Sequence, residues 1–111
     1  MLSKQDITRD WLPRYTGTDI GDFGDYILLT NFDNYVKKFS ERFNQPIRGE
    51  DGPMQTCTNT EGLTIINFGI GSANAATIMD LLVACNPSGV LFLGKCGGLK
   101  QRSEIGNFIL P

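Results

Sequence analysis

The sequence predicts an α/β protein built around a central, mixed and largely parallel sheet. Two observations support this: short apolar runs alternate with helical patterns, and glycine-rich segments follow the runs. Strands that alternate with helices are typical of parallel sheets, because each parallel pair needs a long crossover connection. At 111 residues, with 41% hydrophobic and 20% charged residues, the chain can bury one modest core.

The first predicted strand is the continuous apolar run at 26–29, which is typical of a strand buried on both faces. Before it, residues 1–25 are expected to form a lead-in with a short helix near 6–11. Asn31 or Asp33 is expected to cap the helix that follows. That helix is predicted by apolar side chains that recur at helical spacing and face the core: Phe32, Tyr35, Val36, Phe39 and Phe43.

Residues 45–61 carry several prolines and glycines and are expected to form a long surface loop. The second strand is predicted at 63–68, and the glycine-containing turn 69–74 leads from it into a helix. This helix, at 75–85, is apolar nearly all round, so it is expected to be buried.

The third strand is predicted at 90–93 and is followed by the glycine-rich loop 94–98, and a fourth strand is expected to begin at 108–110. A sheet that stops there lacks covering helices, so we expect the domain to be truncated at its C-terminus. On this basis residues 1–25 are the lead-in and residues 26–111 are the first half of an α/β domain.

Composition excludes several classes of function. The net charge of −2 gives no reason to expect nucleic acid or an anionic membrane as a partner. The chain has no histidine, and Cys57, Cys85 and Cys96 share no metal-type spacing, so no metal site is expected. No signal segment or membrane-length apolar run occurs, which predicts a cytoplasmic protein with reduced thiols.

Two nucleotide-binding motifs nearly match and are rejected. Residues 69–74 give G-x-G-x-x-N, which lacks the third glycine of the dinucleotide fingerprint, and no acidic residue ends the next strand. Residues 89–96 imitate a P-loop, but their middle is the predicted strand and Cys96 replaces the magnesium-binding hydroxyl.

The loops 31–33, 69–74 and 94–98 remain as candidates for a binding site, because ligands of such folds sit at the carboxyl ends of the strands. Glycine lets the backbone approach a ligand closely, and helix N-termini attract anions. On pattern alone the glycines are equally typical of tight turns.

Three segments resemble the purine nucleoside phosphorylase and nucleosidase superfamily, and within it most closely the AMP nucleosidases. They are 14–18 leading into 27–32, then 66–78, and 93–99 followed by 105–109. The resemblance implies a three-layer α/β fold and a homo-oligomer, built as a hexamer or from dimers. It also implies hydrolysis of AMP to adenine and ribose 5-phosphate with no cofactor, and AMP or a related purine nucleotide or nucleoside as the small-molecule partner.

The resemblance also implies roles for individual residues. Ile70 is expected to lie under the ribose and Asn31 near the phosphate or water. The glycine-rich loop is expected to meet phosphate, sugar and the edge of the base, and Lys95 is its only cation for the 5′-phosphate. The substrate-binding set implied in this way is Asn31, Ile70, Gly71, Lys95, Cys96, Gly97 and Gly98.

Departures from the family's pattern bear on the nucleophile. Tyr35 and Phe92 stand where phosphorylases of this superfamily place phosphate-binding arginines, which favours water over phosphate. The glutamate by which related nucleosidases activate water is also missing, and Asp33 is the nearest carboxylate. The family's catalytic acid and ribose-binding Met-Glu pair would lie beyond Pro111, so we expect residues 1–111 alone to be inactive.

Other interpretations remain open from the sequence. A nucleoside phosphorylase or a methylthioadenosine nucleosidase would share these motifs, and a non-catalytic nucleotide-binding module would keep the glycine loops without the acid. Whether residues 45–61 reach a neighbouring subunit's site is also open, with Arg48 as the candidate contact.

Overall fold

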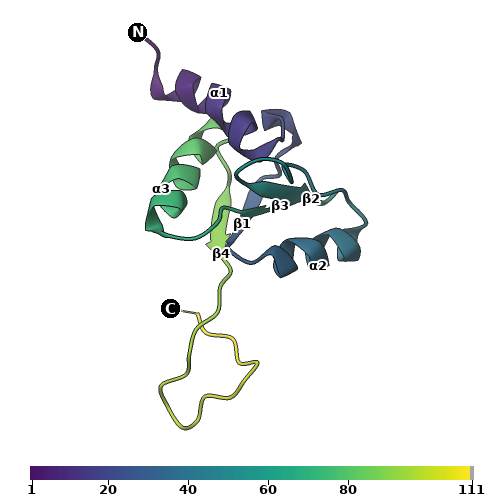
Figure 1. Ribbon diagram of the computed structural model, residues 1–111, viewed down its shortest axis with the longest axis vertical. Helices are drawn as coiled ribbons and strands as arrows, with labels where there is room; N and C mark the ends of the chain where they lie inside the picture. Colours follow the sequence, from purple (N-terminus) through teal and green to yellow (C-terminus); the bar gives the residue numbers. More distant parts are fainter. Residues whose placement is uncertain (111) are drawn as a thin grey trace.

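The computed structural model describes residues 1–110 as a four-stranded sheet with helices packed against it (Figure 1). The strand order is β2-β3-β1-β4, in which β1 is parallel to β3 and β4 while β2 is antiparallel to β3. The predicted mixed, largely parallel sheet is therefore confirmed. The elements are α1 (Lys4–Thr16), η1 (Ile20–Asp22), β1 (Tyr26–Thr30), α2 (Asp33–Phe43), β2 (Gln55–Thr58), β3 (Leu63–Asn67), α3 (Ser72–Leu81), η2 (Leu82–Ala84) and β4 (Gly89–Phe92).

Two apolar clusters hold helices against the sheet. One joins α1, α3 and η2 to the sheet through buried side chains such as Leu12, Ile27 and Ile78. The other joins α2 to β2 and β3 through Val36 and Ile65. Because successive strand residues point to opposite faces, a strand can contribute to both clusters, and the sheet is covered on both sides.

The first helix is longer than expected and runs from Lys4 to Thr16. Ser3 and Asp6 form a reciprocal capping box at its start, and Gly17 ends it in the left-handed conformation at φ 62°. The helix buries Thr8, Leu12 and Thr16, which lie four residues apart on one face. Two of these three are threonines, so a search for apolar periodicity finds only part of the helix.

The expectation that residues 45–61 form one long loop is wrong, because β2 lies within them. Gln55–Thr58 pairs with β3, and Arg48 forms an isolated bridge to Thr56 on the other side of β2. The strand reads Gln-Thr-Cys-Thr, with Thr56 and Cys57 buried. Its buried positions are therefore one polar residue and one thiol, and no apolar run marks it.

The helix predicted at 75–85 begins earlier, at Ser72, and ends at Leu81, after which η2 continues for one turn. The expectation that it is buried all round is wrong. Ile78, Leu81 and Leu82 are buried, whereas Met79 is 49% exposed on the outer face. A single apolar face packs on the sheet, and the remaining apolar residues lie on the surface.

The strand β4 lies at an edge of the sheet, and Val90, Leu91 and Phe92 are all exposed there. The chain then runs away from the sheet as an extended loop (Figure 1). The expected fourth strand at 108–110 is wrong, since these residues are irregular and exposed. Pro111 lies outside the described residues.

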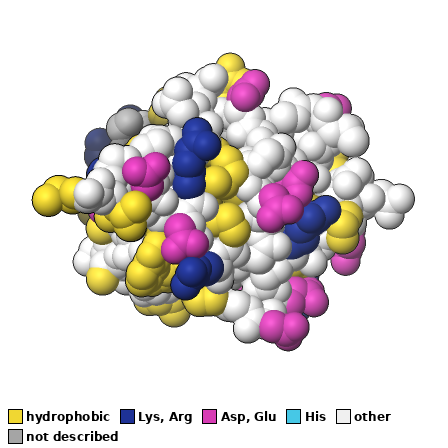
Figure 2. Space-filling model, turned by 90° about the horizontal axis from the view of Figure 1, so that it is seen from above, with side chains coloured by type: hydrophobic (Ala, Val, Ile, Leu, Met, Phe, Trp, Pro, Cys, Tyr) yellow, Lys and Arg dark blue, Asp and Glu magenta, His cyan; other side chains and the backbone are white. Residues whose placement is uncertain are grey.

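The surface seen from the N-terminal end carries separate acidic and basic side chains with hydrophobic ones between them (Figure 2). No large patch of a single charge forms on this face, in keeping with the net charge of −2. Among residues 1–110, no helix has the length and apolar character needed to cross a membrane.

Candidate functional site at the strand ends

The carboxyl ends of β1, β3 and β4 meet at one edge of the sheet. In the strand register, Thr30 pairs with Asn67 and Leu29 with Phe92. Backbone hydrogen bonds extend this order past the strands: the Phe68 amide donates to the Thr30 carbonyl at 3.1 Å. The three loops that the sequence singled out therefore start side by side, as the parallel arrangement requires.

The loop after β1 holds Asn31 half-buried at the edge of the sheet. Its Oδ1 is buried and has no hydrogen-bond partner among the described residues. Such an orphaned acceptor is costly unless a donor from water or a ligand reaches it. The predicted capping role of Asn31 or Asp33 is wrong, because Phe32 is the N-cap of α2 and no side chain caps it.

The loop after β3 is shaped by glycines. Gly69 and Gly71 adopt φ of 84° and 105°, values that residues with a side chain rarely take. Ile70 between them is 82% exposed, so its side chain projects from the loop toward solvent. The helix α3 begins directly afterwards at Ser72 and presents its unpaired backbone N–H groups at the same edge.

One side chain links these two loops. The Asn67 Nδ2 donates to Oδ1 of Asp33, and the Asn67 Oδ1 accepts a 3.0 Å hydrogen bond from the Gly69 amide. Sequence reasoning missed Asn67, although a polar residue that ends an apolar strand just before a glycine turn is a usable signal.

The loop after β4 brings Lys95 to the site. Its Nζ lies 4.6 Å from the ring centroid of Phe32 and 5.6 Å from that of Tyr35. The two rings pack edge to face at 5.3 Å and form a surface that attracts a cation. Phe92 instead packs on Phe68, with ring centroids 6.0 Å apart.

The remaining predicted residues lie farther along the same loop. Cys96 is exposed, and Gly97 and Gly98 line a hollow of about 700 Å³ that the loop itself forms together with residues 99–110. Asn31, Ile70, Gly71 and Lys95 thus gather at the strand ends, whereas Gly97 and Gly98 do not. No group of His, Cys, Asp or Glu side chains within residues 1–110 is arranged to hold a metal.

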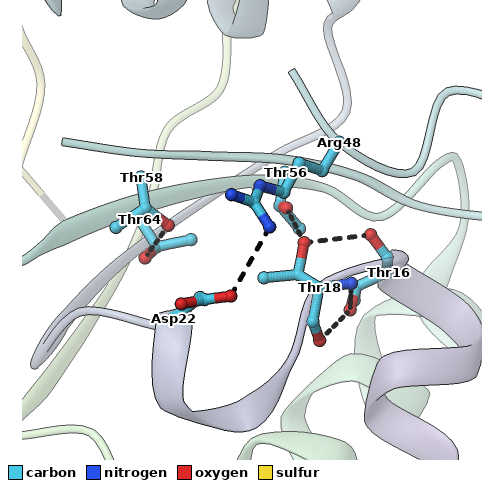
Figure 3. A network of polar contacts seen from close by, with 7 residues as sticks. All are labelled: Thr16, Thr18, Asp22, Arg48, Thr56, Thr58 and Thr64. Carbon is cyan, nitrogen blue, oxygen red and sulfur yellow. Dashed lines mark hydrogen bonds and ion pairs between the residues drawn. The ribbon is translucent and has the colours of Figure 1, made fainter. Parts of the chain in front are cut away.

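A second polar cluster lies near β2 (Figure 3). Its buried members Thr16, Thr18 and Thr56 share hydroxyl hydrogen bonds, and Arg48 reaches Asp22 at 3.5 Å. Three of these side chains border a small hollow of about 180 Å³, which is lined by Thr18, Asp22, Gln45, Pro46, Arg48 and Thr58. Arg48 is half-exposed and lines this hollow.

Comparison with known proteins identifies the family of the chain. Residues 25–111 match the Phosphorylase superfamily. The chain is 27% identical to the AMP nucleosidases of Escherichia coli K12 and O157:H7, over 89% of the chain and 28% of each relative.

Among solved structures, the chain resembles the AMP nucleosidase from Bacteroides thetaiotaomicron VPI-5482 with a TM-score of 0.88 and 55% identity. That match covers 95% of the chain and 46% of the solved one, so the chain spans less than half the length of these relatives. Both the sequence match and the shared fold lead to one conclusion: the chain belongs to the Phosphorylase superfamily.

Proposed function

We propose that the chain is part of an enzyme that hydrolyses AMP to adenine and ribose 5-phosphate. The observation that carries this proposal is the 55% identity, over 95% of the chain, to a solved protein named AMP nucleosidase. In the reaction, the bond between C1′ of the ribose and N9 of adenine breaks, and its electron pair leaves with the base. Water adds to C1′, and a proton reaches the departing adenine.

The strand ends supply the sugar and phosphate side of this site. We place the ribose over Ile70 and Gly71 and assign the orphaned Asn31 Oδ1 as an acceptor for a water molecule or a sugar hydroxyl. An amide oxygen can only accept, so this atom favours partners that carry a proton. Cys96, Gly97 and Gly98 would close on the nucleotide from the loop beyond β4.

We assign the 5′-phosphate to Lys95. An exposed cation–π contact contributes about 0.5–1 kcal/mol, whereas a hydrogen bond to a charged group contributes about 1.5–3 kcal/mol. A phosphate therefore competes well with Phe32 and Tyr35 for the ammonium group, and the rings keep the lysine near the site when no anion is bound.

Water is the nucleophile that this arrangement favours. The resemblance implies that Tyr35 and Phe92 stand where phosphorylases place phosphate-binding arginines, and both residues take part in aromatic contacts. Lys95 would then serve the phosphate of the substrate.

A substrate panel tests the proposal on the complete gene product that contains this sequence. AMP, adenosine and methylthioadenosine are supplied separately, and adenine release is followed by chromatography. We expect AMP to be the preferred substrate, because only AMP offers a 5′-phosphate to Lys95. Preference for adenosine or methylthioadenosine would show that the substrate is a nucleoside rather than AMP, and no release from any of them would favour a nucleotide-binding module.

Cytoplasmic location and assembly into a homo-oligomer are also part of the proposal.

A further inference from the structure

Asn67 is the only described side chain that bonds both to the loop after β1 and to the loop after β3. It is the last residue of β3, directly opposite Thr30 in the register, and is half-buried there. Its Nδ2 donates to Asp33 at the start of α2, and its Oδ1 accepts from the Gly69 amide. A single planar amide thus ties two segments that are 34 residues apart in the chain.

The chemistry of the two partners fixes the orientation of this amide. A carboxylate can only accept, and a backbone N–H can only donate, so the Asn67 amide satisfies both in one orientation and neither in the reverse one. The bond to the Asp33 carboxylate is charge-assisted and therefore stronger than a neutral one.

The segment that Asn67 holds has few other restraints. Both Gly69 and Gly71 have positive φ, and the side chain of Ile70 is 82% exposed and packs against little. Besides the Asn67 bond, the Asn74 side chain donates to the Ile70 carbonyl at 3.2 Å, and the Ala75 amide donates to the Gly71 carbonyl at 3.1 Å. Both of those bonds come from α3, so Asn67 is the anchor on the strand side.

We infer that Asn67 is a positioning residue, which holds the Gly69–Gly71 loop and the Asp33 carboxylate in fixed relation at the strand ends. The inference rests on the proposed function, in which this loop lies under the ribose. Asn67 acts by positioning the loop and Asp33. What matters is the hydrogen bond between the side chains at positions 33 and 67, and the carboxylate can belong to either of these two residues.

Exchanging the two side chains tests this inference in the complete protein. Asn67→Asp places two carboxylates in contact, and their repulsion breaks the link. We expect kcat/KM for AMP to fall about tenfold or more near pH 7.5, on the scale that misplacement by an ångström produces. The kcat/KM of this variant, divided by that of wild type at the same pH, should rise as the pH is lowered toward about 5. One proton shared between the carboxyl groups at positions 33 and 67 then restores a hydrogen bond between them.

The double variant Asp33→Asn, Asn67→Asp separates positioning from chemistry. In this variant the amide at position 33 donates to the carboxylate at position 67, whose second oxygen still accepts from Gly69, so the link is rebuilt with its polarity reversed. We expect kcat/KM within about threefold of wild type, a loss of less than about 1 kcal/mol, and no recovery at low pH. Loss of activity in both the double variant and Asp33→Asn would overturn the inference and assign the Asp33 charge to the reaction itself.

Other ionisable groups do not account for the expected recovery. The ionisable residues nearest to the link along the chain are Tyr35 and Lys37 on α2, and Lys95 beyond β4 lies against the rings of Phe32 and Tyr35. The adjoining strand ends and the first turn of α3 carry none. None of these is a carboxylate or a histidine, the side-chain types that titrate between about pH 4 and 7. Asn34→Asp is the matched control: Asn34 is exposed beside Asp33, and we expect the variant to keep the wild-type profile.

Hydrogen exchange of the segment 67–74 without nucleotide distinguishes failure of this inference from failure of the proposed function. We expect faster exchange in Asn67→Asp near pH 7.5 than in wild type, and near wild-type exchange in the double variant. If wild type releases no adenine from AMP, the proposed function fails while exchange still tests the link. If wild type hydrolyses AMP and Asn67→Asp matches it in both readouts, the inference alone is wrong.

Discussion

Lys95 shows how a single side chain connects the aromatic packing of the site to its proposed ligand. Its ammonium group lies over Phe32, and the same rings that attract it leave its remaining N–H donors free for an anion. The role proposed for it is specific to the 5′-phosphate. Removing the Lys95 charge should therefore weaken the binding of AMP and change the binding of adenosine very little.

Lys95→Met in the complete protein is expected to raise KM for AMP by about 10- to 100-fold, which corresponds to losing about 1.5–3 kcal/mol of charge-assisted binding. The KM for adenosine should change little. Lys38→Met, on an exposed turn of α2, is the matched control and should leave both values unchanged. Steady-state kinetics with the two substrates decide the matter, and equal effects on both would contradict a phosphate-specific role.

The three cysteines are expected to react with iodoacetamide in the order Cys96, Cys85, Cys57. Burial raises the pKa of the Cys57 and Cys85 thiols, which keeps them as unreactive thiols, while Cys96 is exposed. Since these pKa values are raised by folding, the stability they contribute is lost as pH rises from the ordinary thiol range toward the raised pKa. Mass spectrometry after brief labelling gives the order, and early labelling of Cys57 would contradict it.

At this scale the sequence located Lys95, Ile70 and Asn31 at one edge, because the ends of adjacent parallel strands must meet there. It did not reveal the bond between Asn67 and Asp33, which depends on the pairing of β1 with β3. The orphaned acceptor of Asn31 was equally invisible, since burial of one atom depends on packing from several segments.

At the scale of elements, the start of β2 depends on a glycine that closes the connection from α2. Gly49 adopts φ 76°, and a Cβ added there would overlap the carbonyl oxygens of Thr16 and Met54. This close approach fixes the turn before β2 against the end of α1. Backbone contacts, which no apolar pattern marks, therefore fix the turn that leads into β2.

Gly49→Ala is expected to lower the free energy of unfolding by about 2 kcal/mol or more, because both the positive φ and the backbone overlap oppose it. Gly21→Ala is the matched control, since a Cβ at Gly21 meets nothing within 4 Å. Urea unfolding of the two variants measures the difference, and an equal effect of both would contradict this account of the turn.

The capping box of α1 makes a prediction about pH. The pKa of Asp6 is lowered by hydrogen bonds from the Ser3 hydroxyl and then from its backbone amide. A lowered carboxyl pKa adds stability at neutral pH that is lost as pH falls through that pKa. Ser3→Ala should therefore lower the melting temperature near neutral pH and by less in acid. A difference that grows in acid would contradict this assignment.

Elements marked by apolar periodicity were predicted well, and those built from threonine were not. The helix α2 was predicted from its apolar spacing, with Val36 and Phe39 buried as expected. The strand β2 and the C-terminal part of α1 escaped notice because Thr16 and Thr56 occupy buried positions. The hydroxyls of Thr8 and Thr16 donate to carbonyls within their own helix, and that of Thr56 bonds to Thr18, contacts that single-sequence patterns do not display.

At the scale of the whole molecule, helices cover both faces of the sheet, and the carboxyl ends of its parallel strands form the candidate site. The order of strands and helices predicted a largely parallel α/β sheet, because connections between parallel strands leave few alternatives, and the family resemblance implied its layers. The predicted strand at 108–110 failed because a short apolar run specifies a strand only where a neighbour is present to pair with it.

The most direct test of the account follows the products that the complete gene product forms from AMP, with and without added phosphate. We predict adenine and ribose 5-phosphate, identified by mass spectrometry, at a rate that does not depend on phosphate. Formation of ribose 1,5-bisphosphate only when phosphate is present would contradict hydrolysis and make the enzyme a phosphorylase. Absence of adenine under both conditions would contradict the proposed activity altogether.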